Sequence, residues 1–138
     1  MPNKTYAKEW LQFSYKNLAT AKLLFEVNHY EDIIGVDIQQ ALEKMIKAMF
    51  AYNNIKIPKE HDLVKLYYLI DEIINLEEDA ILKLRIATNY YKEDRYPNPN
   101  YELPAYKEIK EVLDFAHKLF LRVCELLEID MDEIIDAR

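Results

Sequence analysis

Glycine is nearly absent from this sequence, since its 138 residues include only one. Tight hairpins, dinucleotide-binding turns and phosphate-binding loops depend on glycine, so its scarcity argues against those architectures. The residues that dominate instead are Leu, Ile, Ala, Lys and Glu, most of which favour helices. The sequence therefore predicts an all-α protein, and its length is that of one domain with a real hydrophobic core.

Cysteine and long apolar runs are equally scarce. Cys124 is the only cysteine, which excludes an intrachain disulfide and a cysteine-rich zinc site. Its apolar helical surroundings predict a buried packing residue. Charged residues interrupt the apolar runs, and the first ten residues lack the apolar core of a signal peptide. We therefore expect a cytoplasmic protein without a membrane span.

Acidic residues outnumber basic ones, which gives a net charge of −7. This charge argues against broad electrostatic binding of nucleic acid and leaves only a local cationic patch for that purpose. The three histidines, His29, His61 and His117, lie far apart in the sequence, and no Glu-x-x-His pair occurs. We therefore expect no metal site and no cofactor.

Apolar residues recur at helical spacing in five stretches. The expected helices cover about residues 6–25, 32–52, 60–74, 80–91 and 104–127. Because short connections favour antiparallel neighbours, the sequence predicts an up-and-down helical bundle over residues 1–128. Residues 129–138 are expected to form an acidic tail or a short helix.

The most distinctive stretch is residues 85–101, RIATNYYKEDRYPNPNY, where a helical pattern ends in tyrosines and Arg95 and then breaks at two prolines. In an up-and-down bundle the starts of helices one, three and five lie at the same end as the finishes of helices two and four. His61 and Tyr90 are then level, and the helix starts favour a bound phosphate or carboxylate. That end is expected to gather Tyr52, Lys56, Lys59, His61, Tyr90, Tyr91, Lys92, Arg95, Tyr96 and Tyr101.

Two segments of the chain resemble one family. The run IQQALEKMIKAMFAYNNIKIPKEHDLVKL resembles the second and third helices of HEPN domains, and ATNYYKEDRYPNPNY resembles the stretch before their last long helix. The resemblance spans about residues 6–127. It implies a compact helical bundle, commonly a homodimer and often encoded beside a minimal nucleotidyltransferase. Family members include metal-independent ribonuclease toxins, nucleotide-binding domains and proteins without known activity.

The ribonuclease members use an arginine followed a few residues later by a histidine, and here the chain departs from them. Arg85 occupies the arginine position, but Tyr90, Tyr91 and Lys92 stand where the histidine should fall. A tyrosine with an ordinary pKa of ~10 is a poor base at neutral pH.

Two hypotheses follow from the resemblance. We prefer an interaction module that dimerises, partners a minimal nucleotidyltransferase and binds a nucleotide or other anion. Its expected contact residues are Arg85, Asn89, Tyr91, Arg95 and Tyr96, and Arg85 and Asn89 lie four residues apart on one helix face. The alternative is a ribonuclease in which Arg85 stabilises the charge of the transition state and His61 or Tyr90 acts as acid or base.

Overall fold

The computed structural model describes residues 1–91 and 103–135, and every regular element among them is a helix. The predicted all-α fold is therefore confirmed. The two long helices of the N-terminal half and the long helix near the C-terminus begin and end within two residues of their expected bounds. The helices are α1 (Lys4–Glu26), α2 (Glu31–Tyr52), α3 (Leu63–Tyr68), α4 (Glu78–Thr88), α5 (Tyr106–Leu126) and α6 (Met131–Ile135).

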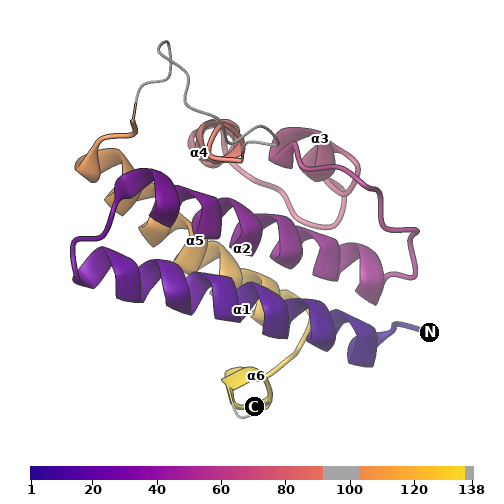
Figure 1. Ribbon diagram of the computed structural model, residues 1–138. Helices are drawn as coiled ribbons and strands as arrows, with labels where there is room; N and C mark the ends of the chain where they lie inside the picture. The colour runs from indigo at the N-terminus through magenta and orange to yellow at the C-terminus, as the bar shows by residue number, and fades with distance from the viewer. Residues whose placement is uncertain (92–102, 136–138) are drawn as a thin grey trace.

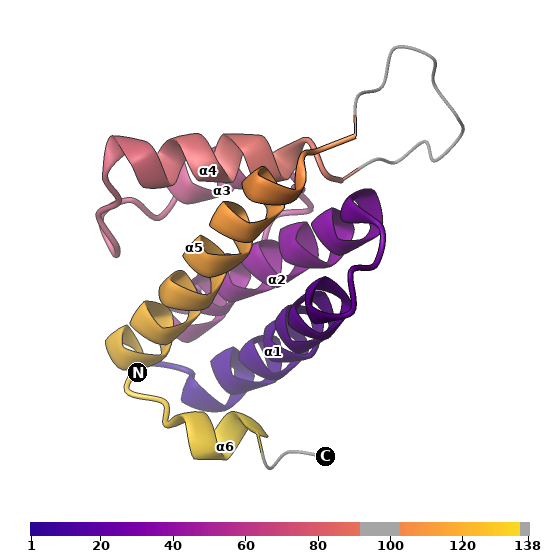
Figure 2. The same ribbon diagram turned by 90° about the vertical axis from the view of Figure 1, so that its left-hand side faces the viewer.

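Helix α2 lies at the centre of the bundle (Figure 1). It runs antiparallel to α1 along one side, while α3 and α4 cover its opposite side. Helix α5 packs across both α1 and α2, and α6 lies beyond α1 (Figure 2). Since α2 has neighbours on several sides, most of its residues are buried, including three with polar or charged side chains.

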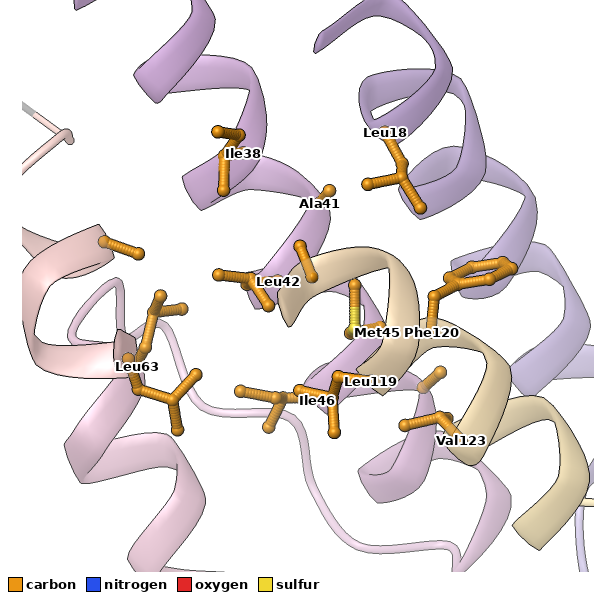
Figure 3. Close-up of a cluster of buried hydrophobic side chains, with 14 of the residues drawn as sticks. Leu18, Ile38, Ala41, Leu42, Met45, Ile46, Leu63, Leu119, Phe120 and Val123 are labelled. Atoms are coloured by element: carbon orange, nitrogen blue, oxygen red, sulfur yellow. The ribbon is translucent and has the colours of Figure 1, made fainter. Parts of the chain in front are cut away.

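The hydrophobic core lies between α1, α2, α3 and α5. In Figure 3, Leu42 and Met45 of α2 lie between Leu63 of α3 on one side and Leu18 of α1 and Phe120 of α5 on the other. All five are at most 4% exposed. Burying a side chain of this size stabilises the fold by about 1.5–3 kcal/mol, so this cluster holds the four helices together.

Three helices end on a residue in the left-handed backbone conformation, although none of the three residues is glycine. Asn28, Asn54 and Glu128 have φ values of 58°, 57° and 55° and follow α1, α2 and α5. At each end the next amide bonds a carbonyl five residues back, as in His29 N to Leu24 O at 2.9 Å. This pairing satisfies carbonyls that the helix end leaves open. Asparagine tolerates this conformation better than other non-glycine residues, which suits a chain with so little glycine.

Helix α3 is much shorter than the stretch 60–74 that the apolar pattern predicts. The Asp62 carboxylate accepts hydrogen bonds from the amides of Val64 and Lys65, at 3.0 and 3.1 Å, so the helix begins after Asp62. Beyond Tyr68 the chain continues in tighter turns, and the Tyr67 hydroxyl accepts a hydrogen bond from the amide of Leu76 at 2.9 Å. The Asp62 cap, which apolar spacing does not reveal, therefore marks the start of α3, and the turns after Tyr68 mark its end.

The expected gathering of helix ends is wrong, because the end of α4 and the start of α5 lie together near the start of α2 and not near its end. This helix begins beside the end of α1, where the rings of Tyr106 and Phe25 stack with centroids 4.8 Å apart. Tyr52 lies at the other end of the bundle, where its carbonyl accepts a hydrogen bond from the amide of Asn3. The segment between α2 and α3 is extended and already returns the chain along α2, and α3 itself is short. The helices after α2 therefore do not alternate in direction over the full length of the bundle. Tyr52 and the start of α5 are therefore far apart.

Helix α6 docks against α1 through the buried side chain of Ile134 and a 3.4 Å ion pair between Lys8 and Glu133. In the ranges that the structure describes, no helix is both long enough and apolar enough to cross a membrane.

Candidate functional site

Three polar side chains on α2 form one buried stripe. Gln39, Glu43 and Lys47 are spaced four residues apart, which places them on one face of the helix. They are 0%, 5% and 6% exposed, respectively. Lys47 Nζ donates to Glu43 Oε2 at 3.0 Å, and Gln39 Nε2 donates to Glu43 Oε1 at 3.1 Å. A carboxylate that is buried this deeply needs such partners, and here it has a charged and a neutral one.

His61 completes this group from the segment that precedes α3. Its Nδ1 lies 2.8 Å from Glu43 Oε1, and its carbonyl oxygen accepts a hydrogen bond from Gln39 Nε2 at 2.9 Å. The α2 stripe thus holds both the ring and the backbone of His61. We call Gln39, Glu43, Lys47 and His61 the Glu43 cluster.

Tyr91 lies against the His61 ring from the end of α4. The two rings stack with centroids 4.4 Å apart and an interplanar angle of 23°. The two segments are also tied by Thr88, whose hydroxyl accepts a hydrogen bond from the amide of Leu63 at 3.0 Å and donates to the carbonyl of Leu84. The expectation that His61 lies level with the end of the fourth helix is therefore confirmed, with Tyr91 rather than Tyr90 as its neighbour.

Tyr90 turns away from His61 and into the bundle. Its side chain is 5% exposed, and its hydroxyl donates to Glu108 Oε2 of α5 at 2.7 Å. Its ring rests on Gly35 of α2, where an added Cβ would lie 2.9 Å from Tyr90 Cγ. The single glycine of the chain thus lets an aromatic ring approach the backbone of α2 closely.

The other predicted site residues divide into two groups. Arg85 and Asn89 are exposed, Arg85 within α4 and Asn89 directly after its last residue. Arg95 and Tyr96 lie outside the described residues. The structure thus brings His61 and Tyr91 into contact, buries Tyr90 and leaves Arg85 and Asn89 open to solvent.

The charge state of Glu43 is fixed by two opposing influences. Burial by itself raises the pKa of this carboxyl, whereas hydrogen bonds from His61, Lys47 and Gln39 and the charge of Lys47 lower it. The hydrogen bonds and the charge prevail, and the pKa of Glu43 lies below its ordinary value of 4.5. Glu43 is therefore an anion at neutral pH despite its burial.

This shift predicts an acid-dependent loss of stability. Because the pKa of Glu43 is lower in the folded than in the unfolded chain, its contribution is complete above about pH 4.5 and is lost as the pH falls through the folded value. Urea unfolding of the wild type and of Glu43→Gln over a series of acidic pH values will measure this contribution. We expect the stability difference between the two proteins to shrink as the pH falls, and a constant difference would contradict the assignment.

Sequence reasoning missed Gln39, Glu43 and Lys47 as a site, since polar residues on an amphipathic helix are usually solvated. One signal was available. The other residues in this part of α2 are mostly apolar, as in the run ALEKMIKAMF. A helix with so wide an apolar surface is buried on most sides, so few of its residues can face solvent. Polar residues at a regular spacing of four on such a helix can be read as a buried stripe.

Over residues 1–91 and 103–135, no group of three or more His, Cys, Asp or Glu side chains is arranged to hold a metal ion. The side chains of the Glu43 cluster can themselves form hydrogen bonds, transfer protons and stack.

Comparison with known proteins gives one family, one related protein and two solved structures of similar fold. The HEPN domain model matches residues 7–127. The chain is 28% identical over 104 residues to a protein named "Putative toxin MJ1304" from Methanocaldococcus jannaschii, and the match covers 70% of this chain and 67% of that protein.

Two solved structures have a similar fold. TT1696 from Thermus thermophilus superimposes with a TM-score of 0.74 at 25% identity, covering 87% of this chain and 97% of that one. ST0689, described as an archaeal HEPN homologue, gives a TM-score of 0.68 at 18% identity and covers 88% of this chain and 97% of its own. These superpositions extend over nearly the whole length of both neighbours.

Proposed function

This chain belongs to the HEPN domain family, and from that membership we propose that it is an interaction module that dimerises and partners a minimal nucleotidyltransferase. It binds a nucleotide or another anion with the residues around the end of α4. The contact residues are Arg85, Asn89 and Tyr91, together with Arg95 and Tyr96 from outside the described residues.

The observation that carries this proposal is the burial of Tyr90. This residue occupies a position where ribonuclease members of the family are expected to have a histidine after the arginine. Its hydroxyl donates to Glu108 at 2.7 Å, and its ring is packed on α2. A side chain held in this way supports the fold and is poorly placed to exchange a proton with a ligand. In this proposal Arg85 stands for the arginine of the family motif, and no histidine follows it at the family spacing.

The outer face of α4 supports a role in protein contact. Leu82, Arg85 and Asn89 follow one another at intervals of three and four residues, so they share a face of the helix. All three are exposed, and Leu82 is 49% exposed. An exposed leucine beside an arginine is a combination suited to protein interfaces, where arginine is enriched and apolar contacts lie at the centre.

Light scattering tests the proposed assembly. We expect the wild-type protein to have the mass of a dimer at micromolar concentration. If α4 forms the contact, Leu82→Glu and Arg85→Glu should each weaken dimerisation or partner binding about tenfold or more, because truncating a central interface residue often costs more than ~1.4 kcal/mol. Lys107→Glu, an exposed change at the start of α5, is the control. A monomer mass for the wild type would overturn the assembly, while normal binding by both α4 variants would exclude this face.

A second candidate is a metal-independent ribonuclease, and the pairing of His61 with Glu43 favours it. A relative of this chain bears the name of a toxin. In this scheme the ribose 2′-oxygen attacks phosphorus and its proton passes to His61. The bond from phosphorus to the 5′-oxygen then breaks, and that oxygen takes a proton from an acid or from water. Arg85 would balance the negative charge that develops on the phosphate oxygens.

Cleavage of several RNAs by the purified protein in EDTA separates the two candidates. The interaction module predicts no cleavage above background by the wild type, Arg85→Ala or His61→Ala. The ribonuclease predicts cleavage by the wild type and a loss of about 100-fold or more in each variant, as expected when an acid–base or charge-stabilising group is removed. Lys65→Ala, an exposed change within α3, is the matched control and should keep wild-type behaviour in either case.

A further inference from the structure

The Glu43 cluster determines which nitrogen of His61 carries the proton. An ionised carboxylate accepts hydrogen bonds and cannot donate one. Glu43 is held in this ionised form by Lys47 at 3.0 Å and by the Gln39 amide at 3.1 Å. The nitrogen of His61 that faces Glu43 at 2.8 Å, Nδ1, must therefore carry a hydrogen. In a neutral ring the lone pair then lies on Nε2.

The environment of the ring leaves that nitrogen available. The His61 side chain is 41% exposed, and within residues 1–91 and 103–135 no hydrogen bond to Nε2 is formed. Tyr91 covers one face of the ring at a centroid distance of 4.4 Å. Gln39 holds the backbone of the same residue through its carbonyl oxygen. The ring is therefore fixed at its Nδ1 edge, at one face and at its backbone, while its opposite edge makes no hydrogen bond to the part of the chain that the structure describes.

We propose that Glu43 is a positioning residue for His61, which fixes the Nδ1–H tautomer and presents a neutral Nε2 as the acceptor for a hydroxyl group such as a ribose 2′-hydroxyl. Lys47 and Gln39 act one step behind, because they keep Glu43 ionised and aligned. This inference rests on the ribonuclease candidate above for the identity of the hydroxyl, although the tautomer itself does not depend on it.

A purely structural role would not require this arrangement. A buried ion pair contributes little net stability compared with apolar side chains of the same volume, because both charges lose their hydration. Two methionines at positions 43 and 47 would fill the same space between α2 and the segment before α3. Unlike the two methionines, the ionised carboxylate of Glu43 supplies at Nδ1 of His61 a hydrogen-bond acceptor that cannot also act as a donor.

Nitrogen-15 NMR of the histidine ring in the full-length protein tests the proposal. The measurement is made at about pH 8, which lies above the ordinary histidine pKa of ~6.5. We expect the wild-type His61 to show a single tautomer with hydrogen on Nδ1. The double variant Glu43→Met/Lys47→Met removes the acceptor without leaving an unpaired charge, and we expect a mixture of both tautomers. Lys44→Met is the control, since Lys44 bonds Asn17 at 2.7 Å on a different face of α2. This variant should retain the wild-type spectrum.

Either of two results would overturn the proposal: a wild-type ring that is mixed or protonated on Nε2, or a double variant whose tautomer is unchanged. The RNA assay is read separately. RNA that stays intact while His61 shows the Nδ1–H form removes the ribonuclease candidate and supports the positioning role of Glu43. RNA that is cleaved while His61 shows mixed tautomers overturns the positioning role and leaves the ribonuclease candidate standing.

Discussion

Replacing Glu43 alone by methionine is expected to lower the free energy of unfolding by about 3–5 kcal/mol, because it leaves the buried ammonium group of Lys47 without its partner. Replacing Glu43 and Lys47 together should change the stability by only about 1 kcal/mol in either direction. The reason is the same burial in both cases. A lone charge in a site that is 6% exposed cannot recover its hydration, whereas an apolar pair of similar volume has none to lose.

Chemical denaturation of the wild type, both single variants and the double variant will measure this coupling as a double-mutant cycle. Lys44→Met again serves as the control, since the α2 helix there is partly exposed. Additive effects, with the double variant as unstable as the sum of the two single ones, would show that Glu43 and Lys47 do not depend on each other.

Replacing Tyr90 by alanine is expected to lower the free energy of unfolding by about 3–5 kcal/mol, the usual effect of deleting a large aromatic side chain from a core. Tyr90→Phe keeps the ring and loses the hydrogen bond to Glu108, so its expected cost is about 1 kcal/mol. Thermal and urea unfolding of both variants will provide the comparison. A loss below ~1 kcal/mol for Tyr90→Ala would contradict the placement of this ring between α2 and α5.

The long helices could be predicted from the sequence because their apolar residues recur at helical spacing over many turns. A pattern of that length fits a helix and no other secondary structure. Helix α3 could not, because the side chain of Asp62 caps its start and the chain continues in tighter turns after Tyr68, where the Leu76 amide bonds Tyr67. The Asp62 cap joins near neighbours in the chain but leaves no mark on the apolar pattern, and the Leu76–Tyr67 bond joins residues whose proximity exists only after folding. The error in the predicted position of the start of α5 has the same origin. A third helix of the predicted length would carry the chain along the whole bundle, whereas the short α3 does not.

The candidate site was predictable in part for a related reason. His61 lies just before the start of a helix. Its distance along the chain from the turn between the third and fourth helices predicts that it lies beside the end of α4, where Tyr91 contacts it. Counting along the chain cannot show which face of α2 meets that segment. Glutamate and lysine are also typical of a solvated helix face, and only the packing on that side of α2 makes Glu43 and Lys47 a buried pair.

The contact between Gly35 and the ring of Tyr90 also has an evolutionary consequence. A methyl group at position 35 would come within 2.9 Å of the ring, which is attached too close to the backbone to swing aside. The two positions should therefore vary together across homologues: a larger residue at position 35 should be accompanied by a smaller one at position 90. An alignment of family members would show this as paired substitutions between α2 and the end of α4. Glycine has the greatest backbone freedom of any residue, yet position 35 would then be among the most constrained positions of the chain.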